Sequence, residues 1–237
     1  MKILLIIPSY NEEKNLLNNY NKIINFNKNS DVKYDAIIID DGSIDNTKEI
    51  CIRNNIPHIS LVHNLGIGGA VQTGYKYAFE NGYDIAVQFD GDGQHDINYV
   101  KNIIEPIINN ECDMCIGSRF INSKSSEFKS SFARRIGIKI ISFFIKLKTG
   151  KKLYDTTSGF RAINKKIISD FAQEYPVEYP EPISTVEVLK RKYMVKEVPV
   201  SMNERENGKS SIRTWKKIYY MFNVILSIIV TGFGGKK

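Results

Sequence analysis

Apolar residues in the first half of the chain fall into two alternating patterns. Short runs rich in β-branched and aliphatic residues, typical of buried strands, are separated by longer stretches in which apolar residues recur at helical spacing. We expect strands at residues 2–7, 36–39, 59–62 and 84–89. We expect helices at residues 16–24, through 50–52 and from 66 to 79. Strands that alternate with helices predict an α/β fold built on one open, mostly parallel sheet flanked by helices.

The second half of the chain is less regular. Its pattern predicts helices at residues 97–108 and 136–147 and another that opens at 178–182. It also predicts strands at residues 114–117 and 195–200, and a turn at 155–162 that enters a further strand. The 136–147 stretch carries basic residues around an apolar stripe, as a helix lying on a surface does. No repeat or linker is visible, so we predict one domain over residues 1–212 and a C-terminal amphipathic helix over 213–237.

The C-terminal stretch from Trp215 to Phe233 is apolar almost throughout and has lysines at both ends. Its apolar part of roughly 16 residues makes about 24 Å of helix at about 1.5 Å per residue. That is short of the roughly 20 residues that span a bilayer. The pattern therefore predicts a helix that associates with a membrane face, with a core helix or an oligomer contact as the alternative.

Composition adds a preference for anionic partners. The 237 residues carry a formal net charge of +7, with 42% hydrophobic and 25% charged residues, which is ordinary for a globular protein. The positive charge favours nucleotide phosphates, nucleic acid or an acidic lipid surface. Lysine and arginine are dispersed and no nucleic-acid-binding signature is present, so we predict no nucleic acid partner.

The three cysteines do not form a fully paired disulfide framework, and we expect a reducing compartment. Cys112 and Cys115 form a lone C-x-x-C motif. On the strand expected there they would point to opposite faces of the sheet. Ordinary packing is therefore favoured over zinc or redox chemistry.

The strongest chemical signal is the stretch Asp90-Gly91-Asp92-Gly93-Gln94-His95, which directly follows a predicted strand. Two carboxylates one residue apart suit Mg²⁺ or Mn²⁺ carried on substrate phosphates, because these cations take a few carboxylates and leave positions for phosphate and water. A solvated acidic loop is the alternative. The other polar clusters, at residues 8–12, 40–45 and 63–70, also follow predicted strands. In an open parallel sheet such clusters gather at one edge, where ligands bind.

Four motifs in order carry a resemblance: Pro8-Ser9-Tyr10-Asn11-Glu12, Asp40-Asp41-Gly42-Ser43-x-Asp45, Asn64-x-Gly66-x-Gly68-Gly69-Ala70 and Asp90-Gly91-Asp92-Gly93-Gln94-His95. Together they closely resemble the family-2 inverting glycosyltransferases, whose GT-A fold has a single Rossmann-like sheet. Within that family the chain looks most like the polyprenyl- and dolichyl-phosphate sugar synthases. The Asp155 to Arg161 segment and Arg205-x-x-Gly208-x-Ser210 support that branch. The resemblance covers about residues 1 to 215.

The resemblance implies a nucleotide-diphosphate sugar as donor. Pro8, Tyr10 and Glu12 would line the base and ribose pocket, and Asp41 or Asp40 would accept hydrogen bonds from base or ribose. Gly66, Gly68 and Gly69 would let the backbone approach the nucleotide, with simple helix entry as the alternative. Asp90 and Asp92 would hold Mg²⁺ or Mn²⁺ on the diphosphate with Gln94 beside them, and the metal would offset charge on the departing diphosphate. Arg205 and Lys209 would close over the same group, whereas His95 only shapes the turn.

The acceptor side is less well defined. A polyprenyl phosphate is already an anion, and Arg119 and Arg134 match the acceptor-phosphate positions of the family, with Arg135 as a substitute. A sugar hydroxyl would instead need a carboxylate base, for which Asp155, Glu178 and Glu181 are the candidates. The Tyr-Pro-Glu-Pro stretch around Glu181 is not typical of the synthase branch, and a carboxylate at a helix N-terminus is the alternative.

Three hypotheses follow. The leading one is a metal-dependent inverting glycosyltransferase, peripherally attached to the cytoplasmic membrane face, that transfers a sugar to polyprenyl phosphate. The second is the same chemistry on a lipid-linked saccharide in cell-surface polysaccharide synthesis. The third is a nucleotide-binding protein without transfer activity. The short C-terminal helix also allows a small integral-membrane partner or a homo-oligomer. The sequence names neither the sugar nor the base of the donor.

Overall fold

The computed structural model of the chain describes residues 1–91, 93–121, 132–202 and 214–231, with only the backbone at 132–134 and 214–220. The described strands form one sheet of seven in the order β3-β2-β1-β4-β6-β5-β7. Their bounds are β1 Ile3–Ser9, β2 Asp35–Asp40, β3 His58–Ser60, β4 Ile85–Gln88, β5 Met114–Ser118, β6 Arg161–Asn164 and β7 Val195–Pro199. Of these, only β6 runs antiparallel to its neighbours. The predicted open, mostly parallel sheet is confirmed.

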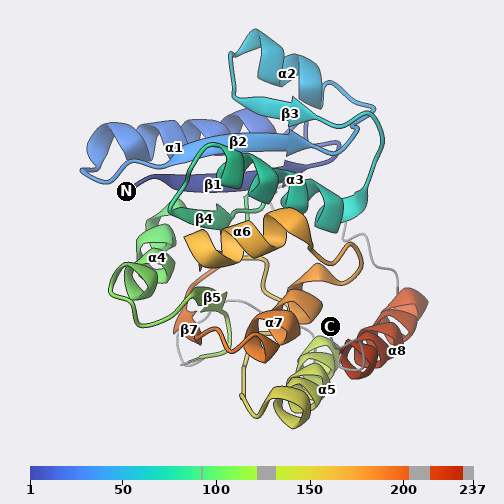
Figure 1. Ribbon diagram of the computed structural model, residues 1–237. Coiled ribbons are helices and arrows are strands. Elements are labelled where there is room, and N and C mark those ends of the chain that lie inside the picture. Colours follow the sequence, from blue (N-terminus) through green and yellow to red (C-terminus); the bar gives the residue numbers. More distant parts are fainter. Residues whose placement is uncertain (92, 122–131, 203–213, 232–237) are drawn as a thin grey trace.

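Helices cover both faces of this sheet (Figure 1). They are α1 Leu16–Asn29, α2 Thr47–Arg53, α3 Gly66–Glu80, α4 Val100–Ile108 after the 3-10 turn η1 Ile97–Tyr99, α5 Phe132–Thr149, α6 Lys165–Gln173, α7 Pro180–Lys190 and α8 Thr214–Val230. The helix α6 was not among the predicted elements, and β3 ends at Ser60 rather than at residue 62.

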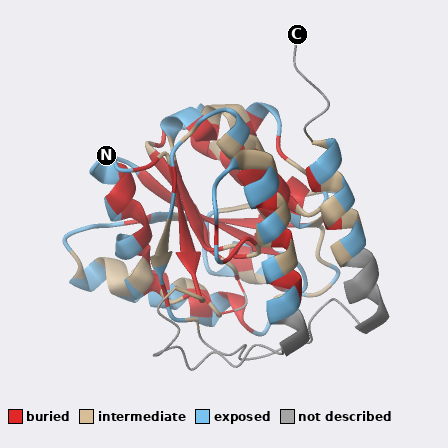
Figure 2. Cartoon of the chain, turned by 90° about the horizontal axis from the view of Figure 1, so that it is seen from below, coloured by how far each residue is buried: buried red, intermediate tan, exposed pale blue. Residues whose placement is uncertain are grey.

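The core is split into two layers by the alternation of side chains along the strands. Leu4 and Ile6 of β1 point into the layer that holds residues of α3, α5, α6, α7 and α8. Ile3, Leu5 and Ile7 point into the layer that holds residues of α1, α2 and α4. Figure 2 shows the buried strands at the centre of the molecule, between helices whose outer faces are exposed. The strands are nearly continuous apolar runs because both of their faces are covered.

Helix α8 packs on the main body, against α5 and α7 (Figure 1). Val224 and Ile228 are fully buried and belong to the larger core layer. One face of the C-terminal helix is therefore core, while Phe222 and Leu226 on its other face are exposed. Within the part of the chain that the structure describes, no helix combines the length and the apolar character needed to cross a bilayer.

The two cysteines of the C-x-x-C motif correct a prediction. Cys112 and Cys115 are both buried, and both lie in the core layer on the α4 side of the sheet rather than on opposite faces. The reason is that β5 begins only at Met114, so strand alternation does not extend back to Cys112. Both thiols are free, and packing accounts for them.

Candidate functional site

The acidic turn after β4 lies at the carboxyl edge of the sheet and is braced by His95. The Asp90 backbone N–H donates to His95 Nδ1 at 2.9 Å, so this ring nitrogen is unprotonated and Nε2 carries the hydrogen. His95 Nε2 lies 3.4 Å from Asp90 Oδ2. The buried ring also stacks on Phe160, with centroids 4.6 Å apart. These contacts agree with the prediction that His95 shapes the turn.

The Asp90 carboxylate, about one-third exposed, occupies space that a glycine leaves open. A Cβ added to Gly159 would lie 2.9 Å from Gln88 Nε2 and 3.2 Å from Asp90 Oδ1. A Cβ on Gly91 would lie 3.0 Å from Ser9 Oγ, so the turn packs closely over the end of β1. The backbone of Gly159 thus approaches the Asp90 carboxylate closely, and the turn itself packs against the end of β1.

Glu181 faces the same edge from the first turn of α7. Its side chain bonds the Gln88 amide and lies within electrostatic range of Arg161 and Asp90. Burial raises the pKa of the Glu181 carboxyl above its ordinary value, and the nearby Arg161 guanidinium opposes that rise. Arg161 is fully buried and donates to the carbonyl oxygens of Ser158 and Glu181. Glu181 is therefore the predicted base candidate that the fold brings beside Asp90.

At the end of β5, Arg119 forms an ion pair with Asp155. Arg119 Nε and Nη2 each lie 2.7 Å from a different oxygen of Asp155, and both residues are buried. The backbone N–H groups of Tyr154 and Asp155 donate to the Glu197 carboxylate, each at 2.7 Å. Both Asp155 oxygens thus accept from Arg119, which favours an anchoring role for Asp155 over a proton-accepting one.

The two predicted donor carboxylates at the end of β2 accept hydrogen bonds from backbone N–H groups of nearby loops. Asp40 Oδ1 accepts from Ser43 N at 3.0 Å, and Asp41 Oδ1 accepts from Leu65 N at 2.7 Å. Both carboxylates are buried, and burial raises the pKa of Asp41.

The three residues predicted to line the base pocket lie at the same edge. Pro8 is buried within β1, Tyr10 is exposed just beyond it, and the half-buried Glu12 carboxylate accepts from Asn15 Nδ2.

At two of the three predicted glycines at the start of α3, close packing leaves no room for a Cβ atom. A Cβ on Gly68 would lie 2.4 Å from the Val177 carbonyl oxygen, and one on Gly69 would lie 2.5 Å from Leu65 Cβ. Gly66 instead has a φ of +77°, a conformation that favours glycine. Gly68 lets the start of α3 meet the segment that leads into α7 and so helps to place Glu181.

The remaining predicted residues are placed only in part. Asp92, Arg205 and Lys209 lie outside the described residues, and Arg134 is described in its backbone alone. Gln94 is half-buried in the turn, and Arg135 and Glu178 are exposed. Among the described residues, no three histidine, cysteine or acidic side chains form a ready metal site. Asp90 is a hard oxygen ligand at the open sheet edge, and this chemistry fits Mg²⁺ or Mn²⁺ as a shared ligand with substrate phosphates.

Two site residues were not predicted. Gln88 is fully buried between Asp90 and Glu181, and Glu197 of the edge strand β7 supports the Arg119–Asp155 pair. The sequence signal for Gln88 was a single amide in an otherwise apolar strand. Glu197 carried no such signal because edge strands often hold charged residues.

This seven-stranded, mostly parallel open sheet defines a GT-A-like α/β fold. The same fold occurs in glucosyl-3-phosphoglycerate synthase from Mycobacterium tuberculosis, which was solved with Mn²⁺, UDP-glucose and phosphoglyceric acid. The two structures align with a TM-score of 0.69 and 16% sequence identity, and the alignment covers 100% of this chain and 81% of that one. The chain matches the model of glycosyl transferase family 2 over residues 4–171 and belongs to that family. It is a glycosyltransferase.

Similar sequences include transferases named for lipid phosphates. A UDP-N-acetylglucosamine–dolichyl-phosphate N-acetylglucosaminyltransferase from Methanococcus voltae is 38% identical over 219 residues, or 84% of each chain. An undecaprenyl-phosphate mannosyltransferase from Micrococcus luteus is 28% identical over 229 residues, covering 90% of this chain and 88% of that one. The chain is thus related to polyprenyl-phosphate sugar transferases along most of its length.

Proposed function

We propose that this protein is an inverting, metal-dependent glycosyltransferase that moves a sugar from a nucleotide-diphosphate sugar to a polyprenyl phosphate at the cytoplasmic membrane face. One observation carries this proposal: Asp90 and the buried Arg119–Asp155 pair lie at the same edge of one sheet. The relatives named for dolichyl and undecaprenyl phosphate support the acceptor class.

On the donor side, Asp90 would hold the metal together with Asp92 and Gln94. The bound metal supplies Lewis-acid assistance to the departing nucleoside diphosphate. His95 and Gly159 keep the Asp90 carboxylate at the sheet edge. Arg205 and Lys209 would add charge-assisted hydrogen bonds to the diphosphate.

On the acceptor side, Arg119 would seat the phosphate of the lipid, with Arg134 or Arg135 as further cations. Asp155 fixes the plane of the Arg119 guanidinium through two hydrogen bonds, and Glu197 fixes the backbone of Asp155. Because Nε and Nη2 already donate to Asp155, Arg119 would meet the phosphate through the N–H groups of Nη1. Because the phosphate oxygen is already an anion, transfer to it needs no strong general base.

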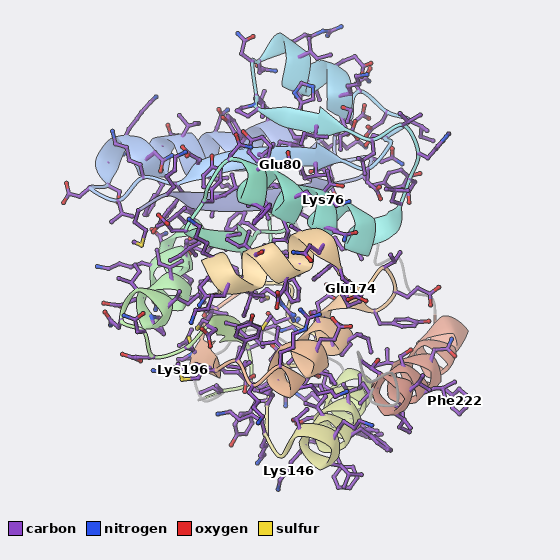
Figure 3. All side chains as sticks on the ribbon, viewed as in Figure 1. Lys76, Glu80, Lys146, Glu174, Lys196 and Phe222 are labelled. Carbon is purple, nitrogen blue, oxygen red and sulfur yellow. The ribbon has the colours of Figure 1, made fainter. Side chains whose placement is uncertain are left out.

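A surface on α5 and α8 supports attachment to a membrane. These neighbouring helices expose apolar side chains together with lysines, a set that we call the α5–α8 face: Lys139, Phe143, Lys146, Leu147, Phe222 and Leu226. Lys146 and Phe222 project away from the body (Figure 3). Apolar side chains that insert at an interface beside lysines that meet anionic headgroups form a peripheral membrane contact. A small integral-membrane partner or a second copy would be alternative occupants.

A second candidate function is transfer to a hydroxyl group of a lipid-linked saccharide. Glu181 favours it, because this carboxyl lies beside Gln88 and Asp90 and burial raises its pKa. A raised pKa suits a general base that works near neutral pH.

The two functions are separated by one incubation. The protein is mixed with a panel of UDP-, GDP- and dTDP-sugars, Mn²⁺ or Mg²⁺, and polyprenyl phosphate, and labelled product is extracted into organic solvent. We expect an extractable product that mild acid cleaves, as a lipid monophosphate sugar is. Product formed only when a lipid-linked saccharide replaces the lipid phosphate would support the second function and reject the first.

A further inference from the structure

Asn19 is a buried amide on the otherwise apolar inner face of α1. It lies between Leu16 and Ile23, both packed in the core, and its own exposure is 7%. A buried amide is costly to fold unless it is hydrogen-bonded, so its partner shows what it is for. The amide nitrogen donates to the acidic turn after β4, and the amide oxygen accepts from Lys22 Nζ at 3.5 Å.

Asn19 bonds this turn at Gly91 and leaves little room for a side chain at Gly93. Its Nδ2 donates to the Gly91 carbonyl oxygen at 2.6 Å. The orientation of the amide is set by this bond, because a carbonyl oxygen only accepts. On the other side, a Cβ added to Gly93, whose φ is +80°, would lie 3.2 Å from Asn19 Oδ1.

The turn is thus held by two side chains from different parts of the chain. His95 fixes the Asp90 N–H from the β6 side, where its ring rests on Phe160. Asn19 fixes the Gly91 carbonyl from the α1 side. A small cavity, lined among others by Asn19, Asp90 and Gly91, lies beside the turn.

We infer that Asn19 is a positioning residue for the divalent cation, acting on Asp90 through the backbone of the adjacent Gly91. This inference rests on the proposed metal-dependent transfer. A metal ligand must be held within a few tenths of an ångström of its place, and groups that orient ligands commonly change metal affinity by about 10–100-fold when they are removed. Asn19 has that relation to Asp90 without touching the metal itself.

Three variants of the full chain test this inference. Asn19→Leu keeps the number and branching of the side-chain heavy atoms but removes the hydrogen bond, and Asn19→Ala removes both. Asn25→Ala is the matched control, since Asn25 lies on the exposed face of the same helix. Binding of Mn²⁺ is followed by the loss of the free-ion EPR signal in the presence of UDP or, in a second series, GDP, against protein-free blanks.

We expect Asn19→Leu and Asn19→Ala to weaken Mn²⁺ binding about tenfold or more, and Asn25→Ala to leave it unchanged. Asn19→Leu should melt below the wild type but above Asn19→Ala, because leucine suits the buried face while the Gly91 carbonyl loses its donor. Wild-type Mn²⁺ affinity in both Asn19 variants, or a loss of melting temperature in Asn19→Leu with no loss of affinity, would overturn the inference.

A failure of this inference can be distinguished from a failure of the proposed function. A wild type that binds Mn²⁺ but transfers no sugar to any polyprenyl acceptor rejects the function, while the Asn19 variants still test the positioning role. A wild type that binds no Mn²⁺ with either nucleotide overturns the positioning role as well.

Discussion

Arg119 and Asp155 form a buried ion pair in which two guanidinium nitrogens each lie 2.7 Å from a carboxylate oxygen. The Arg119 backbone N–H also donates to the same carboxylate, at 3.0 Å. A single carboxylate thus fixes both the backbone and the side chain of an arginine at the end of β5. This relation sets the direction in which a cation is presented at the sheet edge.

Replacing Asp155 by asparagine should therefore damage both stability and acceptor use. Removing one partner of a buried pair leaves an uncompensated charge and costs about 3–5 kcal/mol. We expect a lower free energy of unfolding in urea and, in the folded fraction, a raised KM for polyprenyl phosphate with little change in the donor KM. Asp31→Asn, at an exposed position, is the control. An unchanged acceptor KM in Asp155→Asn would remove Arg119 from the acceptor site.

Gly159→Ala tests the placement of Asp90. The new methyl group would lie 2.9 Å from Gln88 Nε2 and 3.2 Å from Asp90 Oδ1, so these side chains must move. We expect the Mn²⁺ concentration that gives half-maximal activity to rise about tenfold or more, because misplacing a ligand weakens the metal site. Thermal melting measures the accompanying loss of packing. A Mn²⁺ dependence identical to that of the wild type would show that Asp90 tolerates displacement.

Removal of the metal should abolish transfer. We expect EDTA to stop turnover of the nucleotide sugar and added Mn²⁺ or Mg²⁺ to restore it, since the cation offsets charge on the leaving diphosphate. Asp92→Asn should also abolish turnover, but added metal should not restore it. The circular dichroism spectrum of this variant should match that of the wild type. Unchanged turnover in that variant would contradict the metal role of the acidic turn.

The raised pKa of Glu181 predicts a pH dependence of stability. In the native protein the Glu181 carboxyl keeps its proton to a higher pH than it does in the unfolded chain, where its pKa is about 4.5. Its contribution to the free energy of unfolding therefore falls as pH rises from 4.5 through the raised native pKa. Glu181→Gln should lessen this fall, as measured by urea unfolding from pH 4 to pH 7. A pH profile of stability identical to wild type would mean that the Glu181 pKa is not perturbed.

Negative charge introduced on the α5–α8 face should release the protein from membranes. Deleting the chain beyond Arg213 is a poor test, because it removes Val224 and Ile228 from the core. We expect Phe222→Glu with Leu226→Glu to reduce sedimentation with anionic vesicles several-fold while the melting temperature is retained. Phe79→Glu, which changes an exposed phenylalanine on α3, should bind vesicles as wild type does. Equal sedimentation of the double variant would reject this face as the membrane contact.

The elements that the sequence predicted well are those set by local pattern. Strands β1, β2 and β4 are continuous apolar runs followed by turn residues, and both signals lie within a few positions. The acidic turn was found for the same reason. Helix α6 was overlooked although Asn164, whose side chain caps Lys166 N and Ile167 N, marks its start.

The features that could not be predicted depend on distant partners. The antiparallel direction of β6 is set by its pairing with β4 and β5, far away in the sequence. The roles of Asn19 and Glu197 depend on contacts with residues 72 and 42 positions away. In the sequence these two residues look like an ordinary helix amide and a surface acid.

The reversal of β6 has a consequence for how such a protein can diversify. Strands β1 to β4 and the acidic turn come from one continuous first half of the chain, whereas Arg119, Asp155 and Glu181 come from the second. Since β6 enters the sheet from the carboxyl edge, the turn before it reaches Asp90 while β1 to β4 keep their pairing. Under the proposed function, the recipient could therefore change through residues 119–181 while the first four strands keep their architecture.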